Sequence, residues 1–409
     1  MRSLSVFRAS GWTTLLATTA LILASSAVAS GQQSEPAPAG RWQAGILTVT
    51  PRIGVRDLGI DTNLFNEAVD PKSDFTFVAT PEAKASLGFP VGRLTFGSQV
   101  DLVYFQTYAR ERSVNTDTRV DFDLPLNRLR VRTSASYVNA RRRQNSEIDA
   151  RVRGTEAEVV VGGAVQVSGV TTLGFEARGT RIAYDSSVVF DGEHLPSRLN
   201  RDEARLRTSL RYSVTPLTAL VLNGDLERWT FELSPLRDAD SLVVFPGVEF
   251  DATALLSGRA FVGYRMFDSH HPDLPGFTGL VASGDLTYTL REATRFSLIF
   301  DRDLTYSYRQ VRPYYLLTSW TGAVRHRLGI GWEIEGRGGL EKLDYSVASP
   351  TGVSFTPPEY IHLYGFRLSY ALGQDSRILF DLAHRNRTSS IDRRNYEALQ
   401  AGVTISYGF

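Results

Sequence analysis

Apolar residues occupy every second position over long stretches of this chain, up to its last residue. Counted back from the end, the apolar positions of the final stretch are Phe409, Tyr407, Ile405, Val403, Ala401 and Leu399. A period of two residues indicates a β-strand with one apolar and one polar face. The alternating stretches run to roughly ten to fourteen residues, whereas strands of soluble sheets average about five or six. Their length favours tilted strands that cross a membrane, as in a transmembrane β-barrel.

The same alternation predicts about eighteen antiparallel strands. We expect them to begin near Gly45, Ser73, Arg93, Ser113, Asn127, Arg153, Thr172, Arg201, Thr218, Ser241, Leu255, Gly279, Thr294, Tyr314, Gly331, Tyr360, Ser376 and Tyr396. Tight turns follow the even strands, and long polar loops such as residues 57–72 and 185–200 follow the odd ones. Short periplasmic turns and longer extracellular loops are typical of outer-membrane barrels. The sequence therefore predicts an all-β transmembrane antiparallel barrel over residues 45–409. Pro81 and Pro246 fall within predicted strands, and we interpret them as bulge or rim positions.

The amino terminus has the pattern of a secretory signal peptide. Arg2 and Arg8 provide positive charge, residues 15–24 form a short apolar stretch, and Ala27-Val28-Ala29 matches a cleavage site. The apolar stretch is too short to span a bilayer. We expect residues 1–29 to be removed near Ala29, and residues 30–44 to form a flexible periplasmic segment before the barrel.

Composition excludes several classes of protein. The chain has no cysteine, so an exported fold of this sequence relies on its sheet rather than on disulfides. A net charge of +1 without basic runs gives no reason to expect a nucleic-acid partner. After the signal peptide, no stretch of about eighteen apolar residues occurs, which excludes a spanning helix.

The polar faces of the predicted strands carry charges of both signs. The lumen-lining candidates are Arg130, Arg132, Glu156, Glu158, Arg205, Arg207, Arg211, Asp225, Glu227, Asp301, Asp303, Glu333, Glu335, Arg337 and Asp381. Opposite charges on neighbouring strands are expected to pair. A barrel of this size leaves a water-filled interior, and walls of mixed sign suit neutral or weakly charged polar solutes.

We find no pattern that indicates an enzyme. The six histidines form no metal-ligand motif, and neither a nucleophile elbow nor a phosphate loop is present. The adjacent pair His270 and His271 and the possible outer-face partners of His384 are the weak exceptions. We therefore expect no catalytic residue, no metal site and no cofactor.

The first predicted loop carries a recognisable motif. Residues 59–65 read Gly-Ile-Asp-Thr-Asn-Leu-Phe, with Asp61, Asn63 and Phe65 as the motif residues, and Ser73, Asp74 and Pro81 follow. This stretch resembles the opening of the family named Putative beta-barrel porin 2. Members of that family are often associated with exopolysaccharide or capsule export, which the resemblance implies and the periodicity does not show. Locally, Asp61 and Asn63 are expected to form an Asx turn.

Four functions remain open at this point. The leading hypothesis is a passive outer-membrane conduit that exports a polysaccharide or another hydrophilic solute. The alternatives are a general diffusion porin, a non-conducting structural or adhesive barrel, and a hydrolase at the rim. A further question is whether the loop of residues 185–200, which contains Val188, Val189 and Phe190, folds inward as a plug.

The expected partners come from two sources. The membrane assignment implies outer-membrane lipid, lipopolysaccharide and the barrel-assembly machinery, and the family resemblance implies periplasmic components of polysaccharide export. We expect Phe409, Tyr407 and Ile405 to act as the assembly signal, because they resemble the carboxy-terminal signal of such barrels.

Overall fold

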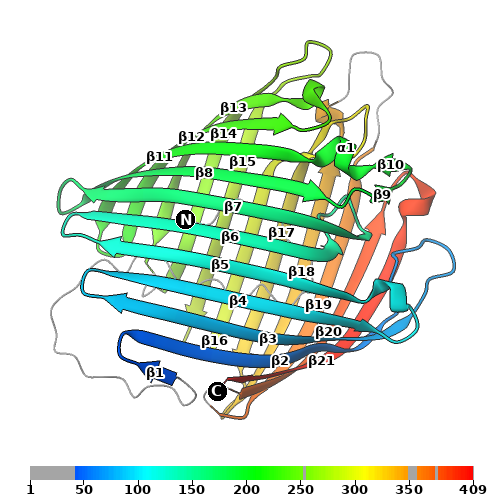
Figure 1. Cartoon of the computed structure of the whole chain (residues 1–409), viewed down its shortest axis with the longest axis horizontal. Helices are drawn as coiled ribbons and strands as arrows, with labels where there is room; N and C mark the ends of the chain where they lie inside the picture. Colours follow the sequence, from blue (N-terminus) through cyan, green and yellow to red (C-terminus); the bar gives the residue numbers. More distant parts are fainter. Residues whose placement is uncertain (1–41, 252–254, 349–356, 374–375, 409) are drawn as a thin grey trace.

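The eighteen predicted strands close into one antiparallel barrel. The computed structural model describes residues 42–251, 255–348, 357–373 and 376–408. In it, β2 pairs with β21, so the first and last barrel strands join and the sheet has no break (Figure 1). The predicted signal peptide and Phe409 lie outside the described residues.

The barrel strands are 12 to 16 residues long. They are β2 (Leu47–Asp61), β3 (Asp74–Phe89), β4 (Gly92–Phe105), β5 (Ser113–Pro125), β6 (Leu129–Arg143), β7 (Arg151–Gln166), β8 (Thr171–Tyr184), β11 (Arg201–Thr215), β12 (Thr218–Phe231), β13 (Ala239–Phe250), β14 (Leu256–Ser269), β15 (Phe277–Leu290), β16 (Thr294–Tyr306), β17 (Tyr314–Arg327), β18 (Trp332–Asp344), β19 (Glu359–Ala371), β20 (Ser376–Thr388) and β21 (Tyr396–Gly408). Every predicted start lies within two residues of an observed one. Side-chain alternation therefore predicted the number of strands and the position at which each begins.

Shorter elements accompany the eighteen barrel strands. They are β1 (Trp42–Ala44), β9 (Val189–Phe190), β10 (Glu193–His194), α1 (Leu195–Leu199) and the 3₁₀ turns η2 (Ala109–Glu111), η3 (Pro235–Arg237), η4 (Ser346–Ala348) and η5 (Asp392–Arg394). Among the described residues, no helix has the length and apolar character needed to cross a membrane.

The amino-terminal strand β1 extends the sheet at the seam. It pairs with Leu47–Val49 of β2, whereas β21 pairs with β2 only from Arg52 onward. Residues 42–44, which the sequence analysis assigned to the flexible segment, are therefore hydrogen-bonded to the sheet.

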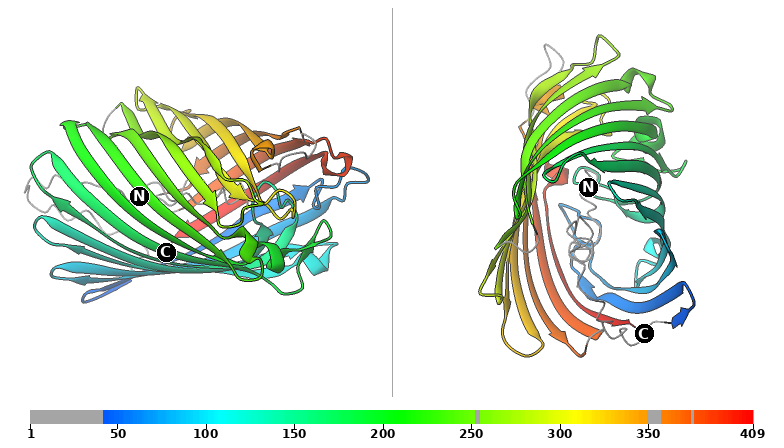
Figure 2. Two further views of the ribbon diagram at one scale, coloured as in Figure 1. Left: turned by 90° about the horizontal axis from the view of Figure 1, so that it is seen from above. Right: turned by 90° about the vertical axis from the view of Figure 1, so that its left-hand side faces the viewer.

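The long loops and short turns separate to opposite ends of the barrel. The loops that carry α1, β9, β10 and the 3₁₀ turns lie at one end, here called the loop end, and the tight connections lie at the other, the turn end (Figure 1). Viewed from the turn end, the barrel has an oval cross-section (Figure 2).

The outer face of the wall is apolar and open. Ile60, Leu206 and Leu226 are each more than half exposed, at 53%, 58% and 57%. Charged side chains on the same strands, such as Asp225 and Glu227, face inward and are buried. This distribution is the reverse of a soluble protein and fits a barrel surrounded by lipid.

The two strand prolines interrupt the sheet without ending it. Pro81 pairs with Ile53 of β2, but the ladder to β4 skips from Ala79 to Glu82. Pro246 pairs with β12, and its ladder to β14 has a gap at the same position. The missing proline N–H explains why only one of the two ladders is broken. Neither proline is at the rim, so the rim alternative was wrong.

The seam between β2 and β21 contains a bulge. The register shifts after Val55, and Asp57 has a φ of 53°. Close packing follows, because a Cβ added to Gly59 would lie 1.9 Å from the carbonyl oxygen of Ala401. Only glycine fits at position 59.

Candidate functional site in the lumen and mouth of the barrel

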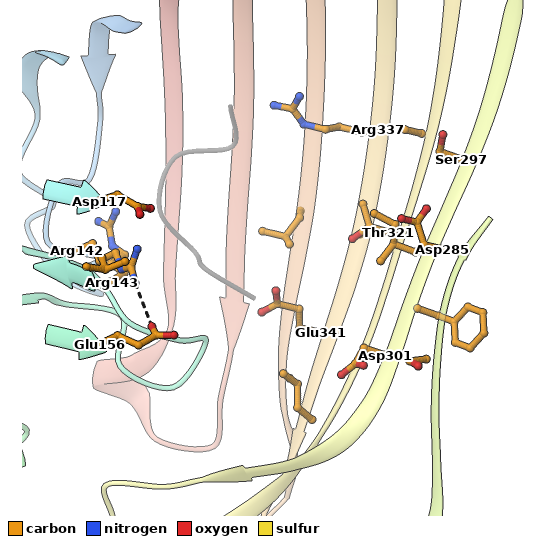
Figure 3. A pocket seen from close by; sticks show the side chains of 18 of the residues that line it. Asp117, Arg142, Arg143, Glu156, Asp285, Ser297, Asp301, Thr321, Arg337 and Glu341 are labelled. Atoms are coloured by element: carbon orange, nitrogen blue, oxygen red, sulfur yellow. Dashed lines mark ion pairs between the residues drawn. The ribbon is translucent and has the colours of Figure 1, made fainter. Parts of the chain in front are cut away.

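The inner face of the barrel encloses a cavity of about 1370 Å³. Its lining comes from strands on both sides of the oval, as Figure 3 shows. Arg142, Arg143, Asp117 and Glu156 lie on one wall, and Arg337, Asp285, Asp301 and Glu341 lie on the other (Figure 3). The lining is strongly charged, as expected for a space that water fills.

Most lumen charges are paired with the neighbouring strand. On β11 and β12, Arg207 Nε donates to Asp225 Oδ1 at 2.6 Å, and Arg205 Nη2 lies 2.6 Å from Glu227 Oε1. These residues are direct or diagonal partners in the ladder. The prediction that opposite charges would pair across strands is confirmed for this part of the wall.

Some pairs extend into networks over several strands. Arg265 on β14 bridges Glu227 on β12 and Asp303 on β16, at 2.5 and 2.8 Å. On the other side, Asp381 accepts from Arg337 at 2.7 Å and from Arg367 at 2.8 Å. Such networks hold long charged side chains against partners on the wall.

The predicted lumen candidates fall into three groups. The large cavity is lined by Glu156, Glu158, Arg207, Arg211, Asp301, Asp303, Glu335 and Arg337. Arg205 and Glu227 line an adjoining cavity of about 120 Å³, to which Glu156 and Glu158 also contribute. The remaining candidates are in ion pairs along the wall: Arg130 and Arg132 with Asp123, Asp225 with Arg207, Glu333 with Arg325, and Asp381 with Arg337 and Arg367.

The loop of residues 144–150 reaches across the loop end to the opposite side of the barrel. Glu147, at its centre, is fully buried and accepts hydrogen bonds from Ser307 Oγ at 2.7 Å and Tyr345 Oη at 2.9 Å. Its backbone carbonyl accepts from Arg394 Nη2 at 2.7 Å. These partners are 160 to 247 residues away in the chain, so the loop crosses the mouth instead of extending outward.

A buried ionic network surrounds this loop. We call it the mouth cluster; it comprises Glu147, Asp149, Tyr308, Arg309, Tyr345, Glu359, Arg387 and Arg394. Arg387 is 1% exposed and pairs with both Asp149, at 2.8 Å, and Glu359. Arg309 reaches the other oxygen of Glu359 at 2.8 Å. Three arginines and three carboxylates thus hold separate loops together where a channel would open.

The loop of residues 185–200 packs over this network. Leu195 and Leu199 are buried, and Val188 and Phe190 pack against the same apolar cluster, whereas Val189 is 59% exposed. Tyr308 Oη donates to Asp191 at 2.9 Å and connects the loop to the mouth cluster. The loop of residues 185–200 therefore lies against the mouth cluster, which includes residues of the loops 144–150 and 307–313.

Burial changes the titration of groups in the mouth loops. Complete desolvation raises the pKa of Glu147, although Arg394 and Arg309 act in the opposite direction. Burial and the nearby Arg198 lower the pKa of Arg237 to about 10. The Arg237 guanidinium donates hydrogen bonds to the backbone carbonyl oxygens of Ser307, at 2.6 Å, and Arg309, at 2.5 Å. It holds the loop of residues 307–313 inward.

The motif of the first loop fastens the seam. Asn63 N–H donates to Asp61 Oδ1 at 2.9 Å, which is the Asx turn expected from the sequence. Asn63 Nδ2 also donates to Glu397 O on β21 at 3.0 Å. Phe65 contacts the edge of Tyr108, with ring centroids 5.0 Å apart. The motif has a structural role at the junction of the first loop and the last strand.

The proposed assembly signal faces outward where it is described. Ile405 and Tyr407 lie on the lipid face of β21 and are 43% and 50% exposed. Phe409 lies outside the described residues.

The histidines do not gather into a metal site. No group of three or more potential ligands occurs among the described residues. His270 Nε2 is 3.1 Å from Asp240 Oδ2, and His271 Nδ1 is 3.7 Å from Asp273. His384 stacks on Tyr364 and pairs with Glu397 at 2.7 Å.

Sequence reasoning missed the mouth cluster. Glu147, Glu359, Arg387 and Arg394 come from loops and strand ends, where alternation carries no information. The one usable signal was charge at the first and last residues of predicted strands, which does not identify partners so distant in the chain.

The fold resembles solved outer-membrane porins. A BenF-like porin from Pseudomonas fluorescens Pf-5 aligns with a TM-score of 0.51 at 10% identity, covering 89% of this chain and 98% of that one. OccAB3 of Acinetobacter baumannii aligns with a TM-score of 0.50 at 9% identity, covering 88% and 99%. At these identities the likeness concerns the fold alone.

The family comparison covers most of the chain. No curated protein matches. The family described as Putative beta-barrel porin 2 matches residues 35–408, which include every strand of the barrel. The likeness of the first loop to this family therefore extends over the entire wall, and the porin-like barrel is an outer-membrane one. The chain belongs to the Putative beta-barrel porin 2 family.

Proposed function

We propose that the protein is a passive outer-membrane conduit for small hydrophilic solutes, with a mouth that is closed in the state described. The observation that carries this proposal is the charged cavity of about 1370 Å³ inside a barrel of the porin family. Paired wall charges such as Arg207 and Asp225 offer exchangeable hydrogen bonds along a route through the barrel.

The closed mouth supports a restricted conduit over a general diffusion porin. A general porin needs an opening that is always present. Here the buried Glu147 and Arg387 join loops across the loop end of the barrel. Solute passage then requires the mouth loops to separate.

Polysaccharide export is the second candidate. It is favoured by hydroxyl groups on the lumen face, such as the pair Thr287 and Ser297 at 3.2 Å, because hydroxyls exchange hydrogen bonds readily with sugars. The mouth cluster counts against it, since a sugar chain would have to hold several loops apart during its whole passage. We therefore rank small solutes first.

Planar-bilayer recording tests the proposal. The purified barrel should show a low basal conductance with rare openings, and loosening the mouth should raise the conductance. A large and permanent conductance would favour the general porin. No conductance in the wild type or in any mouth variant would favour a structural barrel.

Three proposals concern export and assembly. Removal of residues 1–29 near Ala29, insertion by the barrel-assembly machinery, and contact with lipopolysaccharide all follow from an outer-membrane location. Mass spectrometry of the mature chain tests the first, because it reports the new amino-terminal residue directly.

A further inference from the structure

Two carboxylates in the lumen differ from the paired charges around them. Asp301 on β16 and Glu341 on β18 are both in register with Ser319 of β17, so the three residues form a row across neighbouring strands. We call these three residues the acidic row. All three are on the inward face, and Asp301 and Glu341 line the large cavity.

Glu341 is buried, and one of its two carboxylate oxygens has no protein partner. It is 4% exposed, and its Oε2 has no hydrogen-bond donor within reach. Figure 3 shows the Glu341 and Asp301 side chains on the same wall, directed into the cavity. A buried carboxylate oxygen without a protein donor costs free energy, and a cationic ligand in the cavity would supply both a donor and a compensating charge.

Arg265, on β14, does not neutralise the acidic row. Arg265 donates Nη2 to Asp303 at 2.9 Å and Nη1 to Glu227 at 2.5 Å, so its guanidinium is engaged by those two carboxylates. Across the cavity, Arg142 pairs with Glu156 at 3.7 Å on its own wall (Figure 3). The acidic row thus faces the lumen as a local patch of negative charge.

The spacing of the acidic row suits an organic cation better than a metal ion. The two carboxylates come from strands separated by one strand, which places their backbones about 9.5 Å apart. No group of three or more ligands that could hold a metal is found in the described parts of the chain. Hydroxyls of Ser319 and Thr321 are on the same face nearby. A short linear diamine can place one ammonium group at each carboxylate.

We propose that the acidic row is a binding site for organic ammonium solutes, with short linear diamines as the best-fitting class. This inference deepens the proposed function, on which it rests for the route by which the solute arrives. The site lies directly beneath the buried cluster of Tyr315, Leu317 and Leu343 at the loop end. A solute bound there lies immediately below the mouth.

Binding is measured without any need for conduction. Putrescine is titrated calorimetrically into the detergent-folded protein, with 1,4-butanediol as the uncharged probe and calcium chloride as the metal probe. We expect putrescine to bind, and Glu341→Gln and Asp301→Asn each to weaken its binding at least tenfold. Butanediol should not bind at the acidic row. Tighter binding of calcium that competes with putrescine would overturn the choice of an organic cation.

Glu82→Gln is the matched control, because Glu82 lines the same cavity on β3 and its loss changes the lumen charge equally. It should leave putrescine binding within twofold of the wild type. Equal weakening in Glu82→Gln and Glu341→Gln would mean a diffuse charge effect and would overturn the site.

Thermal stability gives a second readout. Removal of an unpartnered buried charge should stabilise the barrel, so Glu341→Gln should lose its heat-modifiable mobility at a higher temperature than the wild type. Lower stability would mean that Glu341 has a structural partner, and would overturn the proposal.

Uptake of labelled putrescine into proteoliposomes separates the two proposals. Binding without uptake in any mouth variant would contradict the proposed conduit and leave the site intact. Uptake that is unchanged by Glu341→Gln and Asp301→Asn would contradict the site and leave the conduit intact.

Discussion

Arg387 and Glu359 lie on neighbouring strands and form a buried ion pair at the loop end of the barrel. Arg387 Nε donates to Glu359 Oε2 at 3.0 Å, and its Nη2 reaches the same oxygen. Both side chains are within 1% of complete burial. The pair is the point at which β19, β20 and the loop of residues 144–150 meet, because Arg387 also donates to Ser146 O at 2.9 Å.

The substitution Glu359→Gln should open the mouth. It leaves Arg387, Arg394 and Arg309 buried with less compensating charge, and breaking a buried pair costs about 3–5 kcal/mol. We expect more frequent openings in planar bilayers than in the wild type. Asp70→Asn is the control, since Asp70 pairs with Lys72 on the surface and such pairs contribute about 0–1 kcal/mol. Equal conductance in Glu359→Gln and the wild type would show that this pair does not hold the mouth closed.

The conductance should depend on pH through Glu147. Burial raises the pKa of Glu147 from its ordinary 4.5, so the closed mouth binds its proton more tightly than an open, hydrated mouth does. This contribution to closure is complete below pH 4.5 and is lost as the pH rises through the raised pKa. Conductance should therefore increase with pH in this window. Glu147→Gln should flatten the profile, and an unchanged profile in that variant would assign the pH dependence to another group.

Shortening the loop of residues 185–200 should raise conductance. Replacing residues 186–199 with a short glycine–serine linker removes the buried Leu195 and Leu199 and the contact of Asp191 with Tyr308. The comparison is a similar replacement of residues 271–274, a loop at the same end that is outside the mouth cluster. If both variants conduct like the wild type, the loop of residues 185–200 does not obstruct the channel.

Asn63→Ala should weaken the seam. It removes donations to Glu67 O and Glu397 O and an acceptance from Glu67 N–H, a loss of about 1–3 kcal/mol. We expect the temperature at which heat-modifiable mobility disappears to fall. Gln400→Ala, which changes a lumen-facing amide of β21, should have a smaller effect. A similar decrease of this temperature in both variants would show that the motif has no special role in stabilising the seam.

Removal of Phe409 should impair assembly into the outer membrane but not export across the inner membrane. The neighbouring Ile405 and Tyr407 face outward on β21, which is compatible with recognition from the lipid side. Cell fractionation with heat-modifiable mobility measures both steps. Normal assembly of the truncated chain would place the signal elsewhere.

Alternation predicted the wall of the barrel because every residue of a membrane-crossing strand is constrained. Leu206 must face lipid and Arg207 must face water, so the sequence between Arg201 and Thr215 admits only one register. For the same reason, the sequence predicted that each wall charge would pair with an opposite charge on a neighbouring strand.

The mouth was not predictable from the sequence. Glu147 and Ser307 are brought together by the path of two loops, and no periodicity restricts that path. The acidic row was equally hidden. Asp301 was among the candidates, but Glu341 was not, and its missing partner is visible only once β17 and β18 are in register.

The short strand β1 has a consequence for how neighbouring molecules behave. β21 does not extend as far as Leu47–Val49 of β2, and Trp42–Ala44 pair with this edge of β2. A bare margin of this kind is a template on which a second copy can add a strand. By occupying it, Trp42–Ala44 should prevent strand pairing between neighbouring barrels. Deletion of these three residues should therefore make a monodisperse protein aggregate.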